Sequence, residues 1–257
     1  MNLLLSTACG IGVLIIAFVP LERAFPRWQH QGVFRSRWYT DLTFLIGQYL
    51  VWGVLVIGFL SWAQQYLNLH MPLELRRAVG SQPWWLQAVE VIVMSDILVY
   101  WAHRWQHHHA FLWRFHAIHH SSEHLDWIAA HREHPVDTIY TLTIINAPAL
   151  LMGFDLAPLA GFLAFRGFWA IVIHSNVSFR LGWLGTIIGS PQLHHWHHHQ
   201  DRDAGNYANI SPLMDICFGT HRAVEDEPKL GSGQTWPKGY LAQLIQPFRR
   251  QRPYLTK

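Results

Sequence analysis

The fold is decided by the stretch Asp96-Ile-Leu-Val-Tyr-Trp-Ala-His103-Arg-Trp-Gln-His107, in which an apolar segment ends and a histidine motif begins. Residues 84–102 are mainly apolar, with Glu90 and Asp96 as their only charges, and are long enough to cross a bilayer as a helix. His103 and His107 are four residues apart, a spacing that places two side chains on one helical face. We therefore predict a membrane helix that carries two imidazoles at its end.

Two further motifs follow, and both read HxxHH. They are His116-Ala-Ile-His119-His120 and His194-His-Trp-His197-His198. Imidazole is the commonest metal ligand, and its neutral nitrogen suits iron, copper, zinc or nickel. The three motifs offer eight imidazoles, which is more than one four- to six-coordinate ion needs. The sequence therefore predicts two metal ions.

The composition indicates a membrane protein. Charged residues make up only 14% of the 257-residue chain, against about a quarter in soluble proteins, while Trp (14) and Phe (14) are abundant. The formal charge of +3 is too small and too dispersed to favour nucleic acid, so we expect no nucleic acid partner. Cys9 and Cys217 lie far apart and indicate neither a disulfide framework nor a thiolate metal site.

Two uncharged apolar runs precede the histidine motifs, at residues 3–19 and 42–62, and each predicts a membrane span. We interpret the first as a retained span, because it has no basic segment before it and no clear cleavage site. The loop between them is rich in arginine: Arg23, Arg27, Arg35 and Arg37. The positive-inside rule places this loop, and with it the histidine end of the third span, on the cytoplasmic side.

A long apolar stretch at residues 138–173 is interrupted at Gly153-Phe-Asp-Leu-Ala-Pro158, which predicts a turn and a membrane hairpin. Both ends of a hairpin lie on one side, so His174 should return to the other histidines. We predict an all-α fold: a polytopic membrane helical bundle of about four spans or hairpin segments, with a cytoplasmic helical cap from residues 103–137 and 175–220 that holds a di-metal site. After Pro228 we expect a solvated or head-group-facing basic end with Arg249, Arg250 and Arg252.

Several segments between residues 95 and 220 resemble, in order, the fatty acid hydroxylase / sterol desaturase superfamily. They are residues 96–104, 112–121, 132–137 (an RxHP element), 174–176, 191–198, 206–207 and 215–220. The chain departs from the family pattern at His195, where many relatives carry an arginine, and at the additional pair His108-His109. The resemblance divides the chain into an N-terminal transmembrane region (1–94), a histidine-rich catalytic domain (95–220, including the hairpin at 138–173) and a cytoplasmic C-terminal tail (221–257).

Members of this superfamily are integral-membrane, non-haem di-iron enzymes that use O2 to oxidise C–H bonds of lipids. The resemblance therefore implies two iron ions, with O2 as co-substrate. It also implies nine metal ligands: His103, His107, His116, His119, His120, His174, His194, His197 and His198. His134 lies in the RxHP element, and we expect it beside the metal site rather than on a metal.

A ligating imidazole usually donates its other N–H to a carboxylate or carbonyl, which fixes the ring. Candidates for this supporting role, each with a helix cap or a surface position as the alternative, are Asp96, Asp126, Asp137, Asn176, Asp203 and Asp215, together with His134. A carboxylate within a span is costly and usually paired, which favours Asp96. By the same argument Arg166 should pair with Asp155 or line a substrate cavity.

Together these expectations describe a membrane-bound di-iron oxygenase that hydroxylates or desaturates an unactivated C–H bond of a sterol or fatty-acyl lipid. Iron suits this chemistry because zinc has no redox chemistry, although zinc can replace iron on overexpression. No flavin, nicotinamide, haem or iron–sulfur motif is visible, so electrons should come from a cytochrome b5-like protein or from a ferredoxin with its reductase.

Two alternatives stay open at this stage. The same metal core supports hydroxylation of a carotenoid or an alkyl-ether lipid. A non-enzymatic membrane protein that binds or transports metal is the other, although a transporter should hold its ligands near the membrane midplane. We expect an integral membrane protein with its active site on the cytoplasmic face, in the inner membrane of a bacterium or, in a eukaryote, in the endoplasmic reticulum.

Overall fold

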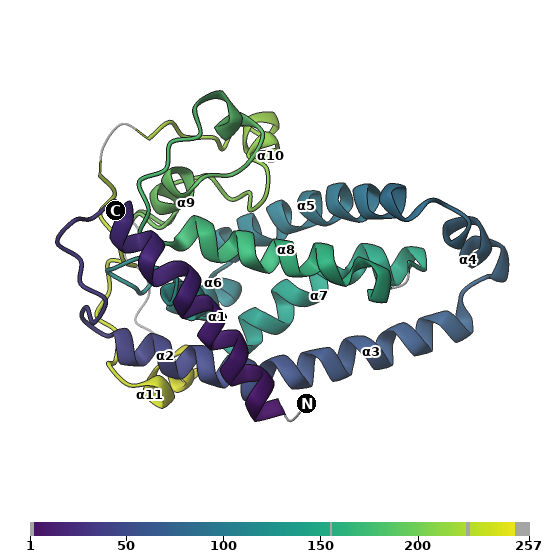
Figure 1. Ribbon diagram of the computed structural model, residues 1–257, viewed down its shortest axis with the longest axis horizontal. Helices are drawn as coiled ribbons and strands as arrows, with labels where there is room; N and C mark the ends of the chain where they lie inside the picture. The colour runs from purple at the N-terminus through teal and green to yellow at the C-terminus, as the bar shows by residue number, and fades with distance from the viewer. Residues whose placement is uncertain (1–2, 155, 225–226, 250–257) are drawn as a thin grey trace.

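The computed structural model describes residues 3–154, 156–224 and 227–249, and this part of the chain is helical with a single isolated bridge between His199 and Leu230. Figure 1 shows the arrangement. The helices are α1 (Leu3–Ala24), α2 (Trp38–Gly47), α3 (Gly53–His70), α4 (Leu73–Gly80), α5 (Trp84–His108), α6 (Ala110–His119), α7 (Pro135–Met152), α8 (Leu156–His174), α9 (Pro191–His197), α10 (Leu213–Cys217) and α11 (Tyr240–Ile245), with the π-helix η1 (Gln48–Trp52) and the 3-10 turns η2 (Ala129–His131), η3 (Gly182–Thr186) and η4 (Gln246–Phe248).

Three long apolar helices make this an integral membrane protein, as the sequence predicts. They are α1, the continuous helix α2–η1–α3 of 33 residues, and α5 of 25 residues. A helix of 33 residues is about 50 Å long, more than the roughly 30 Å hydrocarbon core, so it extends beyond the bilayer. Large apolar side chains on these helices, such as Ile16 and Ile57, point outward, as lipid-facing residues do.

The predicted hairpin is formed by α7 and α8. Gly153 ends α7 in the left-handed conformation at φ 79°, which glycine adopts without steric cost, and its N–H donates to the carbonyl of Ala149. Pro158 lies in the first turn of α8 and does not break it. The hairpin packs on α5, where the Ser95 hydroxyl donates to the carbonyl of Ile145 at 2.7 Å.

The cap differs from the predicted helical layer. Between residues 175 and 220 only α9 and α10 are α-helical, with seven and five residues, and the rest is loop and 3-10 turn. Glycine and proline punctuate this region and prevent longer helices. The consequence is chemical, because backbone carbonyls that a helix would use internally remain available to side chains.

The C-terminal segment packs on the cap-proximal end of the bundle, in contrast to the solvated end expected after Pro228. Trp236 is buried, and the Tyr240 hydroxyl accepts a hydrogen bond from the indole nitrogen of Trp52 at 3.0 Å. The Thr40 hydroxyl donates to the carbonyl of Lys238 at 2.6 Å. Arg249 is exposed, while the expected Arg250 and Arg252 lie outside the described residues.

Candidate metal centre

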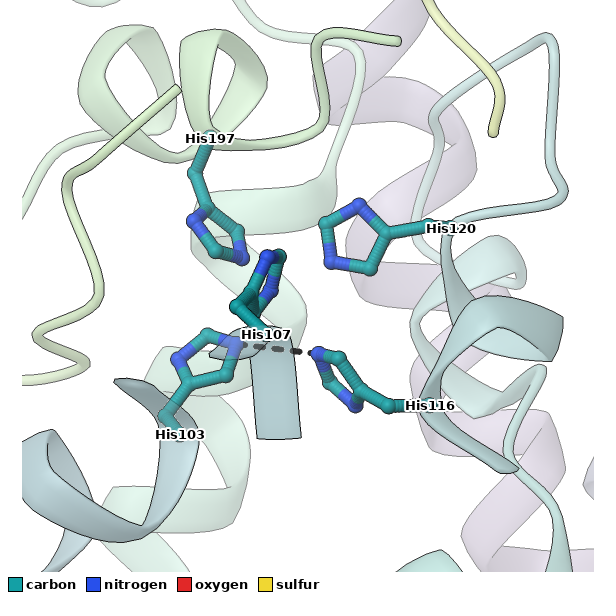
Figure 2. Close-up of side chains that lie close together, drawn as sticks. All are labelled: His103, His107, His116, His120 and His197. Carbon is teal, nitrogen blue, oxygen red and sulfur yellow. Dashed lines mark hydrogen bonds between the residues drawn. The ribbon is translucent and has the colours of Figure 1, made fainter. Parts of the chain in front are cut away.

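Nine buried or half-buried histidines gather in two groups. Two of the helices that carry them, α6 and α9, lie at the end of the bundle opposite α4 (Figure 1). In each group the ring nitrogens that could bind a metal lie within 4.8 Å of one another. The first group is His103, His107, His116, His120 and His197, which point toward a common centre in Figure 2, and the second is His119, His174, His194 and His198. These are the nine residues that the sequence predicts as ligands.

Helical geometry divides the motifs between the two groups. His103 and His107 lie in the last turns of α5, and His174 is the last residue of α8. In each HxxHH motif the residues four apart share a group, while the residue between them joins the other group. Positions i and i+4 differ by about 40° around a helix, whereas i+3 lies about 60° to the other side, so one short helix serves two centres.

Local sequence determines where α9, which carries the last motif, begins. Ser190 caps its N-terminus, because the Ser190 hydroxyl oxygen accepts a hydrogen bond from the N–H of Leu193 at 3.3 Å. Pro191 occupies the first turn, where its missing N–H costs nothing. The seven-residue helix presents His194 and His197 inward, and His198 follows as its C-cap.

Backbone carbonyls fix the tautomer of five of these histidines. In each, Nδ1 lies at hydrogen-bonding distance from a carbonyl oxygen, which can only accept, so Nδ1 carries the proton and Nε2 a lone pair. The pairs are His103 with Tyr207 (2.7 Å), His107 with Arg202 (2.7 Å), His197 with Gly205 (2.8 Å), His119 with Arg132 (3.3 Å) and His174 with Ala170 (2.6 Å).

His116 has a carboxylate partner in the same position. Its Nδ1 lies 2.9 Å from Oδ2 of Asp137, and both side chains are buried. The Gln106 amide donates to the other oxygen of Asp137 and holds the carboxylate in place. An imidazole that donates to a carboxylate becomes a more basic ligand.

Pairs of Nε2 atoms lie close together in both groups. His174 Nε2 is 2.9 Å from His119 Nε2, and His103 Nε2 is 3.1 Å from His116 Nε2, although Nδ1 carries the proton in all four rings. Two lone pairs cannot form a hydrogen bond with each other. Two nitrogens bound at right angles to one ion, at about 2.1 Å each, would be about 3 Å apart. The spacing therefore fits a metal ion in each group.

Burial keeps these rings neutral. It lowers the pKa of His119, His120, His194 and His198 well below the usual value, with further lowering from neighbouring histidines. Burial also lowers the pKa of His197 to about 3, despite the opposing hydrogen bond to Gly205. A neutral imidazole is the form that binds metal, so this part of the site is ready for ligation at neutral pH.

Comparison with known proteins identifies the family. The profile of the family described as fatty acid hydroxylase matches residues 88–220, slightly more than half of the chain. The chain belongs to the fatty acid hydroxylase family. It contains two groups of histidines that could hold metal ions and three helices long enough and apolar enough to cross a membrane.

Three relatives show the range of this fatty acid hydroxylase family. The chain is 38% identical to ornithine lipid hydroxylase OlsE of Rhizobium tropici over 176 residues, which are 66% of this chain and 52% of that protein. It is 33% identical to human (Homo sapiens) alkylglycerol monooxygenase over 152 residues, 58% of this chain and 33% of the relative. It is 27% identical to a putative methylsterol monooxygenase of Dictyostelium discoideum over 216 residues, 82% and 78% of the two chains.

The chain therefore spans about half of the ornithine lipid hydroxylase that it matches and a third of the human alkylglycerol monooxygenase. No solved structure matches the chain.

Only Asp137, of the residues predicted to support the ligands, forms a hydrogen bond with one of the nine histidines. Asp215 supports His103 indirectly. Its carboxylate accepts hydrogen bonds from the N–H groups of Tyr207 and Ala208, both at 2.8 Å. It thereby holds the segment whose Tyr207 carbonyl accepts the hydrogen bond from His103 Nδ1. Asp96 accepts from the N–H groups of Ile210 (3.3 Å) and Ser211 (3.2 Å) and anchors the same loop.

The remaining candidates lie in other places. Asn176 accepts from the N–H of Trp28 at 2.8 Å, and Asp126 pairs with Arg35. His134 caps α7, and its Nε2 donates to the carbonyl of Leu244 at 3.1 Å. Asp203 is exposed and 3.7 Å from His108. None of these contacts involves one of the nine histidines.

Arg166 lies 3.9 Å from Asp96, so within the described residues its charged neighbour is the intramembrane carboxylate. The predicted partner Asp155 lies outside the described residues. His195, the departure from the family pattern, is fully buried, with Nε2 3.0 Å from the carbonyl oxygen of Ser175 and its ring against Trp28.

Sequence reasoning missed the backbone acceptors and one further buried histidine. The carbonyls of Arg202, Gly205 and Tyr207 belong to a loop in which the resemblance marks residues 206–207 but predicts no acceptor role, and Gly205 at φ 78° is a local turn signal. His131 is also buried, and its Nδ1 lies 3.1 Å from Oε1 of Gln48 in the π-helix. It belongs to neither group.

Proposed function

We propose that the chain is an O2-dependent di-iron oxygenase that hydroxylates or desaturates an unactivated C–H bond of a membrane lipid. The observation that carries the proposal is the pair of adjacent groups of ring nitrogens, in which the Nδ1 atoms of six rings are held by a carbonyl or by Asp137 and their Nε2 lone pairs converge. Two ions held by these nitrogens would suit iron, which could change its oxidation state there.

The chain's own residues would prepare the centre. The nine Nε2 atoms would hold the metals, and bound iron would supply the activation of O2. Asp137 and the five backbone carbonyls orient the rings, so that little rearrangement is needed when metal binds. Burial of His107, His120, His197 and His198 excludes water from the reacting atoms. Zinc would fit the same nitrogens and give an inactive protein, so metal supply decides activity.

The relatives favour a lipid substrate. Their names describe an ornithine lipid, an alkylglycerol and a methylsterol as substrates of those proteins. We infer an amino-acid-containing lipid as the first candidate, since the ornithine lipid hydroxylase shares 38% identity with this chain. An alkyl-ether lipid is the second candidate, because alkylglycerol monooxygenases of four animals also match.

The proposed location is the cytoplasmic face of a membrane, with the bacterial inner membrane first and the endoplasmic reticulum second. The arginine-rich loop between α1 and α2 contacts the cap, because the N–H of Trp28 donates to Asn176 and the Trp28 ring packs on His195. The loop and the metal groups thus share one side, and the positive-inside rule favours the cytoplasmic side for the arginine-rich loop. We propose a cytochrome b5-like protein, or a ferredoxin with its reductase, as the electron donor.

Activity in lipid nanodiscs tests this function. Iron-loaded protein would receive electrons from a ferredoxin and its reductase or from cytochrome b5, with an ornithine lipid, an alkylglycerol and a sterol offered in parallel. We expect O2-dependent gain of one oxygen atom, or loss of two hydrogen atoms, in one lipid class. Zinc-loaded protein and His107→Ala are the controls. Protein with two irons that consumes electrons yet changes no lipid would overturn the proposal.

A further inference from the structure

A cavity of about 380 Å³ lies between α1, the loop that joins α1 to α2, and the start of η2. Its walls are mainly apolar, with Ile11, Ile15, Trp38 and Trp127 among them. None of the nine histidines lines it, so it is distinct from the metal groups. Its volume is in the range of sites that bind small molecules.

One end of the cavity is charged. Glu22 lies there, and its Oε1 accepts hydrogen bonds from the N–H of Trp127 at 2.7 Å and of Asn176 at 2.9 Å. The second oxygen, Oε2, accepts no hydrogen bond from the described residues. Asp126 also lines this end, but Arg35 occupies both of its oxygens at 2.7 Å. Glu22 Oε2 is therefore the carboxylate oxygen at this end that can accept a hydrogen bond from a ligand.

A cation is the natural partner for that acceptor. A carboxylate in a mainly apolar cavity is costly unless a positive charge or donors complete its shell. Arg23 also lines the cavity and is exposed, so it offers a guanidinium to the same cavity. Two charges of opposite sign in one cavity are complementary to a headgroup that carries both an ammonium and an anionic group.

The shape of the cavity adds an apolar tail to that headgroup. Ile15 and Ile11 precede Glu22 by seven and eleven residues on α1, which places them about 10 and 16 Å along the helix axis. Because α1 is long and apolar enough to cross a membrane, this direction leads into the hydrocarbon region. Figure 1 shows α1 running obliquely across the bundle from its cap end. A polar end followed by an apolar wall of this length matches an amphiphile.

We propose that this cavity binds a zwitterionic amino lipid, with its ammonium at Glu22, its anionic group at Arg23 and its chain along Ile15 and Ile11. The proposal rests on the proposed function in one respect, since it names the class of lipid that the enzyme takes. Glu22 bonds to Trp127, seven residues after His120, and to Asn176, two residues after His174. The headgroup is thus held against the two loops that leave the metal groups.

Lipid retention tests the site. Purified protein is stripped of lipid in detergent and then incubated with equal amounts of an ornithine lipid that has a free side-chain ammonium, phosphatidylethanolamine, phosphatidylglycerol and diacylglycerol. The retained lipids are counted per chain by mass spectrometry. We expect about one amino lipid per chain, enriched about tenfold or more over the lipids that lack an amine, as one charge-assisted hydrogen bond gives. Whichever amino lipid is retained identifies the source of the headgroup.

Three variants separate headgroup from tail. Glu22→Gln keeps an oxygen for the two backbone donors but removes the charge, so the enrichment for amino lipids should fall about tenfold. Ile15→Trp fills the apolar wall and should abolish retention of every lipid. Ile16→Trp is the matched control, because Ile16 is the next residue of α1, is exposed and does not line the cavity. It should retain lipid as the wild type does.

Two outcomes would overturn the proposal: equal retention of neutral and amino lipids by the wild type, or unchanged retention in both Glu22→Gln and Ile15→Trp. Metal content of the same preparations separates this result from the proposed function. A lipid site that fails while two ions remain bound leaves the oxygenase proposal intact. Wild-type protein that holds no metal in these preparations speaks against the oxygenase, whatever lipid it retains.

Discussion

At the residue scale, Asp137 is the one carboxylate within the described ranges that contacts a histidine of the metal groups. Its charge favours donation from His116 Nδ1 and so strengthens Nε2 as a ligand. We expect Asp137→Asn to weaken metal binding in the first group about 10- to 100-fold, as loss of such partners does. Titration with ferrous iron against a chelator measures this. Asp203→Asn, at an exposed carboxylate, should leave both affinities unchanged.

Gly205 tests the role of the backbone acceptors. Its φ is 78°, and a Cβ there would collide with the carbonyl oxygen of Thr220, so Gly205→Ala must move the carbonyl that holds His197. We expect a loss of about 2–4 kcal/mol in stability and a lower metal content. Gly219→Ala is the control, since Gly219 has a similar φ of 70° but open space around it.

The Gly219→Ala variant should lose only about 1–2 kcal/mol and keep its metal. Thermal unfolding and metal analysis of both variants decide the matter. If Gly205→Ala behaves like Gly219→Ala, the carbonyl of Gly205 does not orient His197.

Residue patterns explain how much of the site was predictable. Spacings of three and four residues name the histidines of three motifs, and the family resemblance adds His174. The division into two groups depends on how α5, α6, α8 and α9 meet, which spacing alone does not define. The carbonyl acceptors are invisible in a sequence, because every residue has one.

At the scale of elements, a buried ion network joins α2 to the loops that flank the metal groups. Arg35 Nη2 lies 2.7 Å from both Asp41 and Asp126, and Arg132 pairs with Asp41. The carbonyl of Arg132 in turn accepts from His119. Nearby Asp126 and Asp41 raise the pKa of Arg35, against the effect of its burial, so its charge persists.

Removal of one charge from this network should be strongly destabilising. Arg35→Met leaves two buried carboxylates with less compensation, and we expect a loss of about 3–5 kcal/mol. Arg114→Met, on the exposed face of α6, should change stability by no more than about 0.5 kcal/mol. Unfolding midpoints in the same detergent give the comparison, and similar midpoints for the two variants would contradict this account.

The elements also show where sequence patterns lose information. The length of the apolar runs located the spans but not the ends of their helices. The helix α5 continues to His108, and the second membrane helix extends from Trp38 to His70. Neither helix stops at the apolar boundary, because no proline or glycine turn interrupts it there. The basic residues of the segment after Pro228 led us to predict that it is solvated. Trp236 and Tyr240 nevertheless anchor it, and two aromatic residues among polar ones carry no periodic signal.

At the scale of the whole molecule, the buried histidines make stability depend on pH. Burial lowers the pKa of His131 and of His197 to about 3, against about 6.5 in an unfolded chain. As pH falls below about 6.5 the unfolded chain takes up protons that the folded protein cannot, so folding becomes less favourable. Each such histidine contributes about 1.4 kcal/mol per pH unit between about 6.5 and 3.

We therefore expect the unfolding midpoint of metal-free protein to fall steadily from pH 7 to pH 5. His131→Gln removes one such site outside the metal groups and should make the slope shallower. Calorimetry or fluorescence across this range measures the slope. A midpoint that does not change between pH 7 and pH 5 would contradict the burial of these rings.

The number of metal ions per chain tests the central claim most directly. Mass spectrometry of protein purified without oxygen, with ferrous iron supplied and zinc withheld, should find two irons per chain. His107→Ala, in the first group, and His198→Ala, in the second, should each lower the count to about one. One ion or none in the wild-type protein would contradict a di-metal centre.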